Sequence, residues 1–424
     1  MNRSRTWRLL ALLLAFALVA AACGSSDDES SDESSDESDS GAGEGGFPEG
    51  TLKIGLAYGV TDAALESITA KAIKSVEAVE ALAEEAGMDV EIVIEDTAGD
   101  PTQGVDAANA LVSQDVHCIL GEARSSVTTP IVAVSKEASI PQISWGSTSP
   151  ALTTIDDGDF FFRALLSDAA QGVVAADHIY NTLGARSAAV VVQNDPYGVG
   201  LGNAFTNGFE ALGGTVDLRV DVDTGTTDFS AEVDEVVAAG ADVIYTVLFG
   251  PEFIPLVSEM AQADAASIDK MFLADAQATT DASEGIEDLV VGLSGLRPAG
   301  GDLSAFATLY TDLTGTEPDA FSEFSFDAAV LCVAAAAAAG EYDPVAIRDA
   351  MRDVSAGGTT YGFDEVPALL AAAAAGDDVD YAGAGSSLDL DENGDVAPIG
   401  AGYSVWSFDD AGVNQDGELL IFEG

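Results

Sequence analysis

Residues 52–94 read LKIGLAYGVTDAALESITAKAIKSVEAVEALAEEAGMDVEIVI, and this stretch decides the fold. It starts with a short apolar strand at 52–57, continues with a helical run at 63–86 and ends with a second apolar strand at 90–94. Gly87 follows the helical run, at the position where a glycine commonly ends a helix. Two strands joined by a helix predict a parallel pair, because parallel neighbours need a crossover connection.

The same alternation continues along the chain. We predict further strands at 117–120, 142–145, 187–193 and 242–248, and helices at 102–113, 128–138, 169–183 and 200–212. Strands that alternate with helices of about 10–15 residues indicate parallel sheets covered on both faces. The predicted fold class is therefore α/β.

The length of 424 residues is too great for one such sheet. We predict two Rossmann-like lobes, each a parallel sheet flanked by helices, joined by several crossovers that form a hinge over a cleft. The least helical transitions lie near 160–167 and 292–301. The predicted N-terminal lobe is 51–166 plus 297–390, and the predicted C-terminal lobe is 167–296 plus 391–424.

The N-terminus has the pattern of an export signal. Residues 1–23 combine three arginines with an apolar run too short to span a bilayer, and small residues lead into Cys23. We predict a lipoprotein signal peptide whose Cys23 carries the lipid; an ordinary secretory signal is the alternative. Residues 24–50, rich in Ser, Asp and Glu, are predicted to form a disordered acidic tether, because such a composition buries too little apolar surface to fold.

The charge of the chain excludes some functions. The sequence holds 73 acidic and 15 basic residues, a formal charge of −58, while 47% of its residues are apolar. The apolar share is enough for packed cores and argues against a wholly disordered chain. So few cations cannot build the basic face that a nucleic acid requires, and we predict no nucleic-acid partner.

The cysteines leave one question open. Besides Cys23, the chain holds only Cys118 and Cys332. These two can pair only if the fold brings their Cα atoms within about 7 Å. We expect two buried free thiols.

Small polar residues gather after two of the predicted strands. The segments are Gly121-Glu122-Ala123-Arg124-Ser125-Ser126 and Gly146-Ser147-Thr148-Ser149-Pro150. Ligands of open parallel sheets bind outside the carboxyl ends of the strands. Glycines admit a close ligand, hydroxyls bond to it, and free N–H groups at a helix start favour a carboxylate. The alternative is that these Ser and Thr residues only cap helices.

Short motifs in a fixed order resemble a known family. They are Ile54-Gly55-Leu56, Glu95-Asp96-Thr97-Ala98-Gly99-Asp100-Pro101, Leu120-Gly121 with Ser125-Ser126, Ile140-Pro141-Gln142-Ile143-Ser144, Asp195-Pro196-Tyr197-Gly198, Thr227-Asp228-Phe229-Ser230, Phe326-Asp327-Ala328 and Leu390-Asp391-Glu392-Asn393-Gly394-Asp395. Their order resembles the type I periplasmic solute-binding proteins of ABC importers, in the branched-chain amino acid (leucine-isoleucine-valine) binding family. The resemblance implies two hinged lobes that close on a small ligand and deliver it to ABC permease subunits.

The resemblance also implies a binding site. Ser125 matches the serine that bonds the ligand carboxylate, and Gly146 and Thr148 match positions that bind the amino acid backbone. Tyr197 matches the tyrosine that covers the ligand from the second lobe. Asp275 is the best candidate for the partner of the ligand ammonium, although Ala276 could occupy that position. The predicted ligand-binding set also includes Ser126, Ser147, Phe249 and Tyr58.

Other chemical signals are interpreted as structural. Arg124 is expected to pair with Glu122 at the surface; in the cleft it would favour anionic ligands. The segment 389–394 resembles a calcium loop but lacks the closing glutamate, so an Asn-Gly turn is preferred. The two histidines, His117 and His178, offer neither zinc spacing nor a catalytic triad. We predict no metal, no cofactor and no enzymatic activity.

The sequence thus predicts a monomeric substrate-binding component of an ABC importer. It would be lipid-anchored at the outer face of the bacterial cell membrane and would touch the membrane only through its anchor. The expected ligand is a branched-chain or related amino acid. The alternatives are the same fold binding urea, a short amide or an organic or aromatic acid, and a ligand-sensing receptor.

The acidic composition leads to a test. Like charges on the folded body repel one another at low ionic strength, and salt screens this repulsion. We therefore expect the melting temperature to rise with added sodium chloride, as in a protein adapted to a saline habitat. Circular dichroism melts at low and high salt measure this; an unchanged or falling melting temperature contradicts it.

Overall fold

The computed structural model describes residues 46–300 and 303–424. The predicted signal peptide with Cys23, and the predicted tether up to residue 45, lie outside these residues. Residues 46–50 form irregular chain, and the side chain of Phe47 packs against the core near Gly87.

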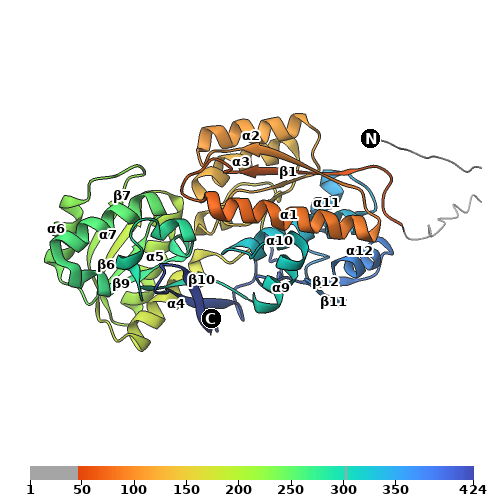
Figure 1. Cartoon of the computed structure of the whole chain (residues 1–424). Coiled ribbons are helices and arrows are strands. Elements are labelled where there is room, and N and C mark those ends of the chain that lie inside the picture. Colours follow the sequence, from red (N-terminus) through yellow and green to blue (C-terminus); the bar gives the residue numbers. More distant parts are fainter. Residues whose placement is uncertain (1–45, 301–302) are drawn as a thin grey trace, which may run out of the picture. The chain divides into compact units, whose positions relative to one another are not determined.

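Two sheets organise the body (Figure 1). The first is parallel, in the order β2-β1-β3-β4-β5, and consists of Leu52–Tyr58 (β1), Val90–Asp96 (β2), Cys118–Leu120 (β3), Gln142–Ser144 (β4) and Phe161–Arg163 (β5). The second, in the order β14-β13-β10-β9-β8-β6-β7, consists of Ser187–Gln193 (β6), Thr215–Val222 (β7), Val243–Val247 (β8), Met271–Leu273 (β9), Ser294–Pro298 (β10), Gly402–Phe408 (β13) and Asn414–Ile421 (β14). Strand β13 runs antiparallel to β10 and β14, and the other pairs are parallel. The α/β prediction is confirmed.

Helices cover both faces of each sheet, as Figure 1 shows for the first one. There α1 (Glu66–Ala86) and α10 (Ser322–Ala339) lie on one side, and α2 (Pro101–Ser113) and α3 (Ser125–Ala138) on the other. On the second sheet, α4 (Asp168–Asp177) and α5 (Pro196–Ala211) pack together on one face, and α6 (Ser230–Ala239) and α7 (Gly250–Asp264) on the other. The remaining α-helices and strands are α8 (Glu287–Val290), α9 (Leu303–Thr314), α11 (Pro344–Ala350), α12 (Val366–Ala374), and the strand pair β11 (Thr359–Gly362) and β12 (Val379–Ala382).

One helix ends where the sequence predicts, and another does not. Helix α1 ends as expected at Gly87, whose positive φ of 98° lets its N–H reach the carbonyls of Ala83 and Glu84. The helix expected at 169–183 instead changes at His178 into a π-helical turn that runs to Thr182. A π-helical turn inserts one extra residue into the hydrogen-bonded turn of a helix, and the spacing of apolar residues in the sequence does not reveal this insertion.

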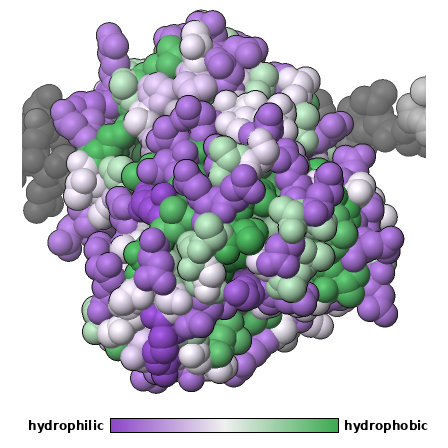
Figure 2. Space-filling model, turned by 90° about the vertical axis from the view of Figure 1, so that its left-hand side faces the viewer, coloured by the Kyte–Doolittle hydropathy of each residue, from purple (hydrophilic) through white to green (hydrophobic). Residues whose placement is uncertain are grey.

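Helix α10 lies at the centre of the first lobe's core. Its length and apolar composition would suffice to cross a membrane, but 89% of it is buried inside the body, as in the core helix of a soluble protein. It is apolar on all sides because α1, α12 and the first sheet surround it. The surface elsewhere is more polar: Figure 2 shows a face on which hydrophilic residues predominate and hydrophobic ones gather in patches between them.

The chain passes between the two sheets after β5, after β10 and before β13. The second passage is held by Arg297 of β10, which pairs with Glu323 at the start of α10 and with Asp416 of β14, each at 2.7 Å. The exact boundaries of the lobes stay a prediction.

The expectation of free thiols is wrong. Cys118 of β3 and Cys332 of α10 form a disulfide, with a Cα–Cα distance of 6.4 Å. The two residues are separated by 214 positions, and both are fully buried. The fold brings them together because α10 packs directly on the first sheet. Local sequence patterns do not predict this contact.

Removing this bond should destabilise the protein. We expect the Cys118→Ala/Cys332→Ala variant to lose about 2–5 kcal/mol of unfolding free energy, chiefly because its unfolded chain is less restricted. Urea denaturation followed by circular dichroism measures the loss. Reductant should weaken the parent protein but leave the double variant unchanged; a variant as stable as the parent contradicts the expectation.

Candidate functional site

A small cavity of about 30 Å³ lies between the strand ends of the two sheets. Its lining residues come from both sides of the cleft and are mostly apolar or aromatic: Leu65, Ile68, Ala123, Trp145, Gly146, Tyr197, Phe249, Asp275, Ala276, Thr279 and Phe321. Among them, the indole N–H of Trp145 and the hydroxyl of Thr279 are buried without a hydrogen-bond partner in the part of the chain that the structure describes. The cavity therefore has an apolar wall and a few unsatisfied polar groups, as is usual for small-molecule sites.

The two predicted polar loops contact each other on the first-lobe side. The Ser147 hydroxyl donates to the Glu122 carbonyl at 2.8 Å and meets the Thr128 hydroxyl at 2.7 Å. The buried Ser125 hydroxyl accepts the Ser149 N–H at 3.2 Å. At Gly146 an added Cβ would lie 2.8 Å from the Cα of Ala123, so only glycine permits this approach. Several of the predicted hydroxyls thus hold the loops together.

Two members of the predicted set on this side differ in their surroundings. Thr148 is fully buried; its hydroxyl makes no hydrogen bond of normal geometry to the described residues, but it lies near Asp168 and favours the ionised form of that carboxyl group. Ser126 is half-buried in the first turn of α3 and does not line the cavity.

Tyr58 lies one layer behind the cavity. Its ring packs on Trp145 with 5.2 Å between centroids, and its hydroxyl meets that of Ser325 at 2.9 Å. It supports the lining residue Trp145 and is not itself part of the wall. Sequence reasoning missed Trp145, although it directly precedes Gly146.

On the second-lobe side, Tyr197 and Asp275 act as a unit. The Tyr197 hydroxyl donates to Asp275 Oδ1 at 2.7 Å and accepts the Ala276 N–H at 3.3 Å. Gln171 Nε2 also donates to Asp275 Oδ1, at 2.8 Å. Burial raises the pKa of Asp275, and these two donors offset part of the rise. Both Asp275 and Ala276 line the cavity, and Asp275 opens the short helix η4 (Asp275–Gln277) after β9.

Arg124 does not form the expected surface pair with Glu122. Its guanidinium binds Asp62, with Nη2 3.0 Å from Oδ1, and lies 4.0 Å from the ring centroid of Phe249. Only its backbone N–H donates to the Glu122 carboxylate, at 2.7 Å. Glu122 is buried, which raises its pKa to about 7 and makes it a poor partner for a surface cation. Arg124 thus spans from the first lobe to a cavity-lining ring of the second.

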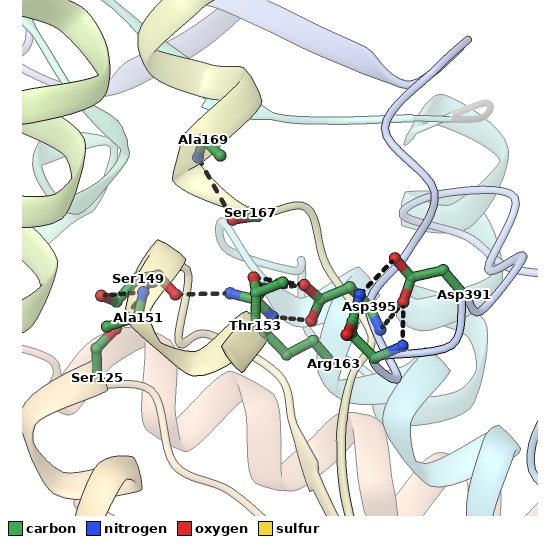
Figure 3. A network of polar contacts seen from close by, with 10 residues as sticks. Ser125, Ser149, Ala151, Thr153, Arg163, Ser167, Ala169, Asp391 and Asp395 are labelled. Atoms are coloured by element: carbon green, nitrogen blue, oxygen red, sulfur yellow. Dashed lines mark hydrogen bonds and ion pairs between the residues drawn. The ribbon is translucent and has the colours of Figure 1, made fainter. Parts of the chain in front are cut away.

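Figure 3 shows a polar network that supports the Ser149 end of this site. Arg163 of β5 donates from Nε to Asp395 Oδ1 at 2.7 Å, from Nη1 to the Ser149 carbonyl at 3.0 Å and from Nη2 to Thr153 Oγ1 at 2.7 Å. The Asp391 carboxylate accepts the N–H groups of Asn393 and Asp395, which closes the predicted Asn-Gly turn. Arg163 therefore ties the loop that carries Thr148 to the third passage of the chain between the sheets.

No metal centre is visible in residues 46–300 and 303–424: no group of three or more His, Cys, Asp or Glu side chains there could hold an ion. A groove of about 1080 Å³ runs between α4, α5 and the loop at Pro150. Its walls are largely apolar, and none of the predicted binding residues lines it. The smaller cavity is therefore the better candidate site.

Comparison with known proteins gives a consistent result. A family model described as periplasmic binding protein matches residues 51–378. Leu/Ile/Val-binding protein homolog 1 of Brucella abortus is 31% identical over 271 residues, which are 63% of this chain and 72% of that protein. An amino acid binding protein of Pseudomonas aeruginosa is 33% identical over 271 residues, 61% of this chain and 70% of that protein.

Solved structures share the fold. A leucine binding protein from Thermotoga maritima has a TM-score of 0.73 at 24% identity and covers 87% of this chain and 99% of its own. A solute-binding protein from R. palustris in complex with 4-hydroxybenzoate has a TM-score of 0.69 at 19% identity and covers 88% of this chain and 98% of its own. The predicted two-lobed fold class is confirmed.

Breaking the Arg163–Asp395 pair should be costly. Both side chains are buried, so Arg163→Ala leaves an uncompensated carboxylate, and we expect a loss of about 3–5 kcal/mol of unfolding free energy. The control is Arg219→Ala, whose partner Asp221 is exposed; it should cost no more than about 1 kcal/mol. Urea denaturation of both variants measures the difference, and equal effects would refute the structural role of Arg163.

Proposed function

The chain belongs to the periplasmic binding protein family, and on that basis we propose that it captures a small α-amino acid in the cavity between its lobes for an ABC importer. The relatives and fold neighbours named above are solute-binding proteins and not enzymes. The sequence pattern at Cys23 supports attachment to the outer face of the cell membrane through a lipid. We propose that the protein acts as a monomer and passes its ligand to the permease subunits.

The observation that carries the choice of ligand is the Asp275 carboxylate in the cavity wall. Within the described residues no ion pair involves Asp275, so no side chain neutralises it. A ligand ammonium group would supply the missing positive charge. An aromatic acid such as the 4-hydroxybenzoate of the R. palustris protein would instead bring a second negative charge. The site therefore favours an amino acid over a benzoate.

The remaining walls suit an amino acid with an aliphatic side chain. Trp145, Phe249, Leu65 and Ile68 offer apolar surface. The ligand carboxylate would lie toward Ser125 at the start of α3, where helix N–H groups favour an anion.

Capture requires the walls to move. A cavity of about 30 Å³ is far below the roughly 300–1,000 Å³ of a usual small-molecule site. The lobes, joined by three passages of the chain, must separate for entry and close around the ligand. Closure would exclude water and strengthen the hydrogen bonds inside.

A thermal-shift screen followed by calorimetry tests the proposal. Leucine, isoleucine or valine at a hundredfold excess over its Kd should stabilise the protein by about 2.7 kcal/mol. Urea, short amides and benzoates should stabilise it less. Stabilisation by benzoates alone would favour the aromatic-acid alternative and overturn the assignment.

The same screen should include Asp275→Asn. Losing the charged partner should weaken amino acid binding by about 1.5–3 kcal/mol, roughly ten- to hundredfold in affinity. Asp269→Asn is the matched control, because Asp269 is exposed at the other end of β9. Unchanged affinity in the Asp275 variant would sink the proposed ammonium contact.

A further inference from the structure

A second buried carboxylate, Asp168, lies about one helical turn before Gln171 on α4, and the Gln171 side chain donates to Asp275 Oδ1 at 2.8 Å. Asp168 is the first residue of α4 and is fully buried; its N–H donates to the Thr148 carbonyl at 2.9 Å. Figure 3 shows the start of this helix, where the Ser167 hydroxyl caps the Ala169 N–H. Across residues 46–300 and 303–424, neither oxygen of the Asp168 carboxylate has a hydrogen-bond partner. A buried ionised carboxylate without donors is strongly disfavoured.

The charged neighbours of Asp168 do not neutralise it. Burial, followed by repulsion from Asp275, raises its pKa well above the usual value, and Asp195 at the start of α5 adds to the repulsion. Arg163 of β5 favours the ionised form, but its charge is already matched by Asp395. The Thr148 hydroxyl also favours ionisation. The net charge of the groups around Asp168 is therefore negative.

Three tyrosines complete the surroundings of the two carboxylates. Tyr197 of α5, Tyr245 of β8 and Tyr403 of β13 are buried, and burial together with Asp168 and Asp275 raises the pKa of each phenol well above its usual value. They are therefore neutral. The hydroxyls of Tyr245 and Tyr403 lack partners in the described residues. None of these groups supplies a positive charge.

The hydrogen bonds decide which carboxyl group is protonated. Asp275 receives two donors, from Tyr197 and Gln171, which stabilise its ionised form. Asp168 has the Thr148 hydroxyl nearby, but in the described residues no donor reaches either of its oxygens with normal hydrogen-bond geometry. Two nearby carboxylates in a dry environment cannot both ionise without a cation, so a single proton on the pair belongs on Asp168.

We propose that Asp168 and Asp275 hold one proton between them in the ligand-free protein, and that an ammonium-bearing ligand displaces this proton when it binds. The identity of the ligand rests on the proposed function. In the exchange, the O–H bond of the Asp168 carboxyl breaks and the proton passes to solvent, while the ligand arrives and stays as an ammonium ion. Asp168 does not line the cavity, so it affects ligand choice through Asp275: a ligand without a cation cannot replace the proton.

This exchange has a thermodynamic signature. Because binding releases one proton, affinity should rise about tenfold per pH unit over the range in which the pair is protonated. A ligand without a cationic group should show no such dependence.

The proton can be tested without any ligand. Infrared difference spectra at pH 7 should show a protonated carboxyl group that is present in the parent, lost in Asp168→Asn and kept in Asp177→Asn. Asp177 is the matched control, since it is exposed on the same helix. Glu122 and Asp327, whose pKa burial raises to about 7, contribute equally to all three proteins. Identical spectra of parent and Asp168→Asn would overturn the proposal.

The pH dependence of stability provides a second ligand-free readout. A carboxyl whose pKa is raised by folding binds its proton more tightly in the folded state, so its contribution to stability is complete below the unfolded value of about 3.9 and is lost as pH rises toward the folded value. Asp168→Asn should therefore melt higher than the parent at neutral pH, and this advantage should shrink toward pH 4. The quantity to compare is the melting temperature of Asp168→Asn minus that of the parent. If this difference is smaller at neutral pH than at acid pH, the proposal is contradicted.

Calorimetry with leucine in phosphate and in Tris buffer counts the released protons. The parent and Asp177→Asn should release about one proton per leucine at neutral pH, and Asp168→Asn about none. Leucine binding to the parent without proton release would overturn the displacement step. If no amino acid binds at all, the proposed function fails, while the infrared spectra still decide whether the pair holds a proton.

Discussion

A charge removed from water needs an opposite charge beside it, and this constraint shapes the interior of the protein. The chain has only 15 basic residues, and three arginines are used for buried or nearly buried pairs. Arg163 pairs with Asp395, Arg297 with Glu323, and Arg124 with Asp62. Each pair joins segments that are far apart in the sequence. These arginines therefore hold in place the chain passages between the lobes and also the loops of the site. Asp275 in the cavity wall has no cationic partner among the described residues.

The same constraint links ligand choice to movement. Asp275 and Asp168 lie where the two lobes meet, and contacts across the cleft surround them, including Arg124 on Phe249 and the Ser149 hydroxyl on the Pro196 carbonyl at 2.7 Å. On the proposed function, opening the cleft would expose the carboxylates to water, and closing it around a cation would place an opposite charge beside them. Either change would lower the free-energy cost of their negative charge. On the proposed function, the electrostatic penalty and the closure of the lobes are therefore coupled.

Local patterns were enough to predict the α/β class, the strands β1 to β4, β6 and β8, and the two polar loops at the strand ends, because these features depend on spacing within short windows. The pairing of distant residues was not accessible in this way. The disulfide joins residues 214 positions apart, Arg163 and Asp395 are 232 apart, and the partner of Arg124 lies 62 positions earlier, in a loop that carries no motif. Asp168 went unnoticed because a helix-start aspartate usually faces water, and only the packed structure shows that this one is buried, with no donor in normal hydrogen-bond geometry among the described residues.

The Cys118–Cys332 bond also sets an order for assembly. Strands β6 to β10 lie within the loop of chain that it closes, so the bond cannot form until those parallel strands of the second sheet and helix α10 have been made. A chain that emerges N-terminus first would hold Cys118 as a lone thiol for most of that time, available to wrong partners. The bond also persists only in an oxidising compartment. Covalent closure of the first lobe thus waits until most of the second sheet has been synthesised, with only β13 and β14 still to follow.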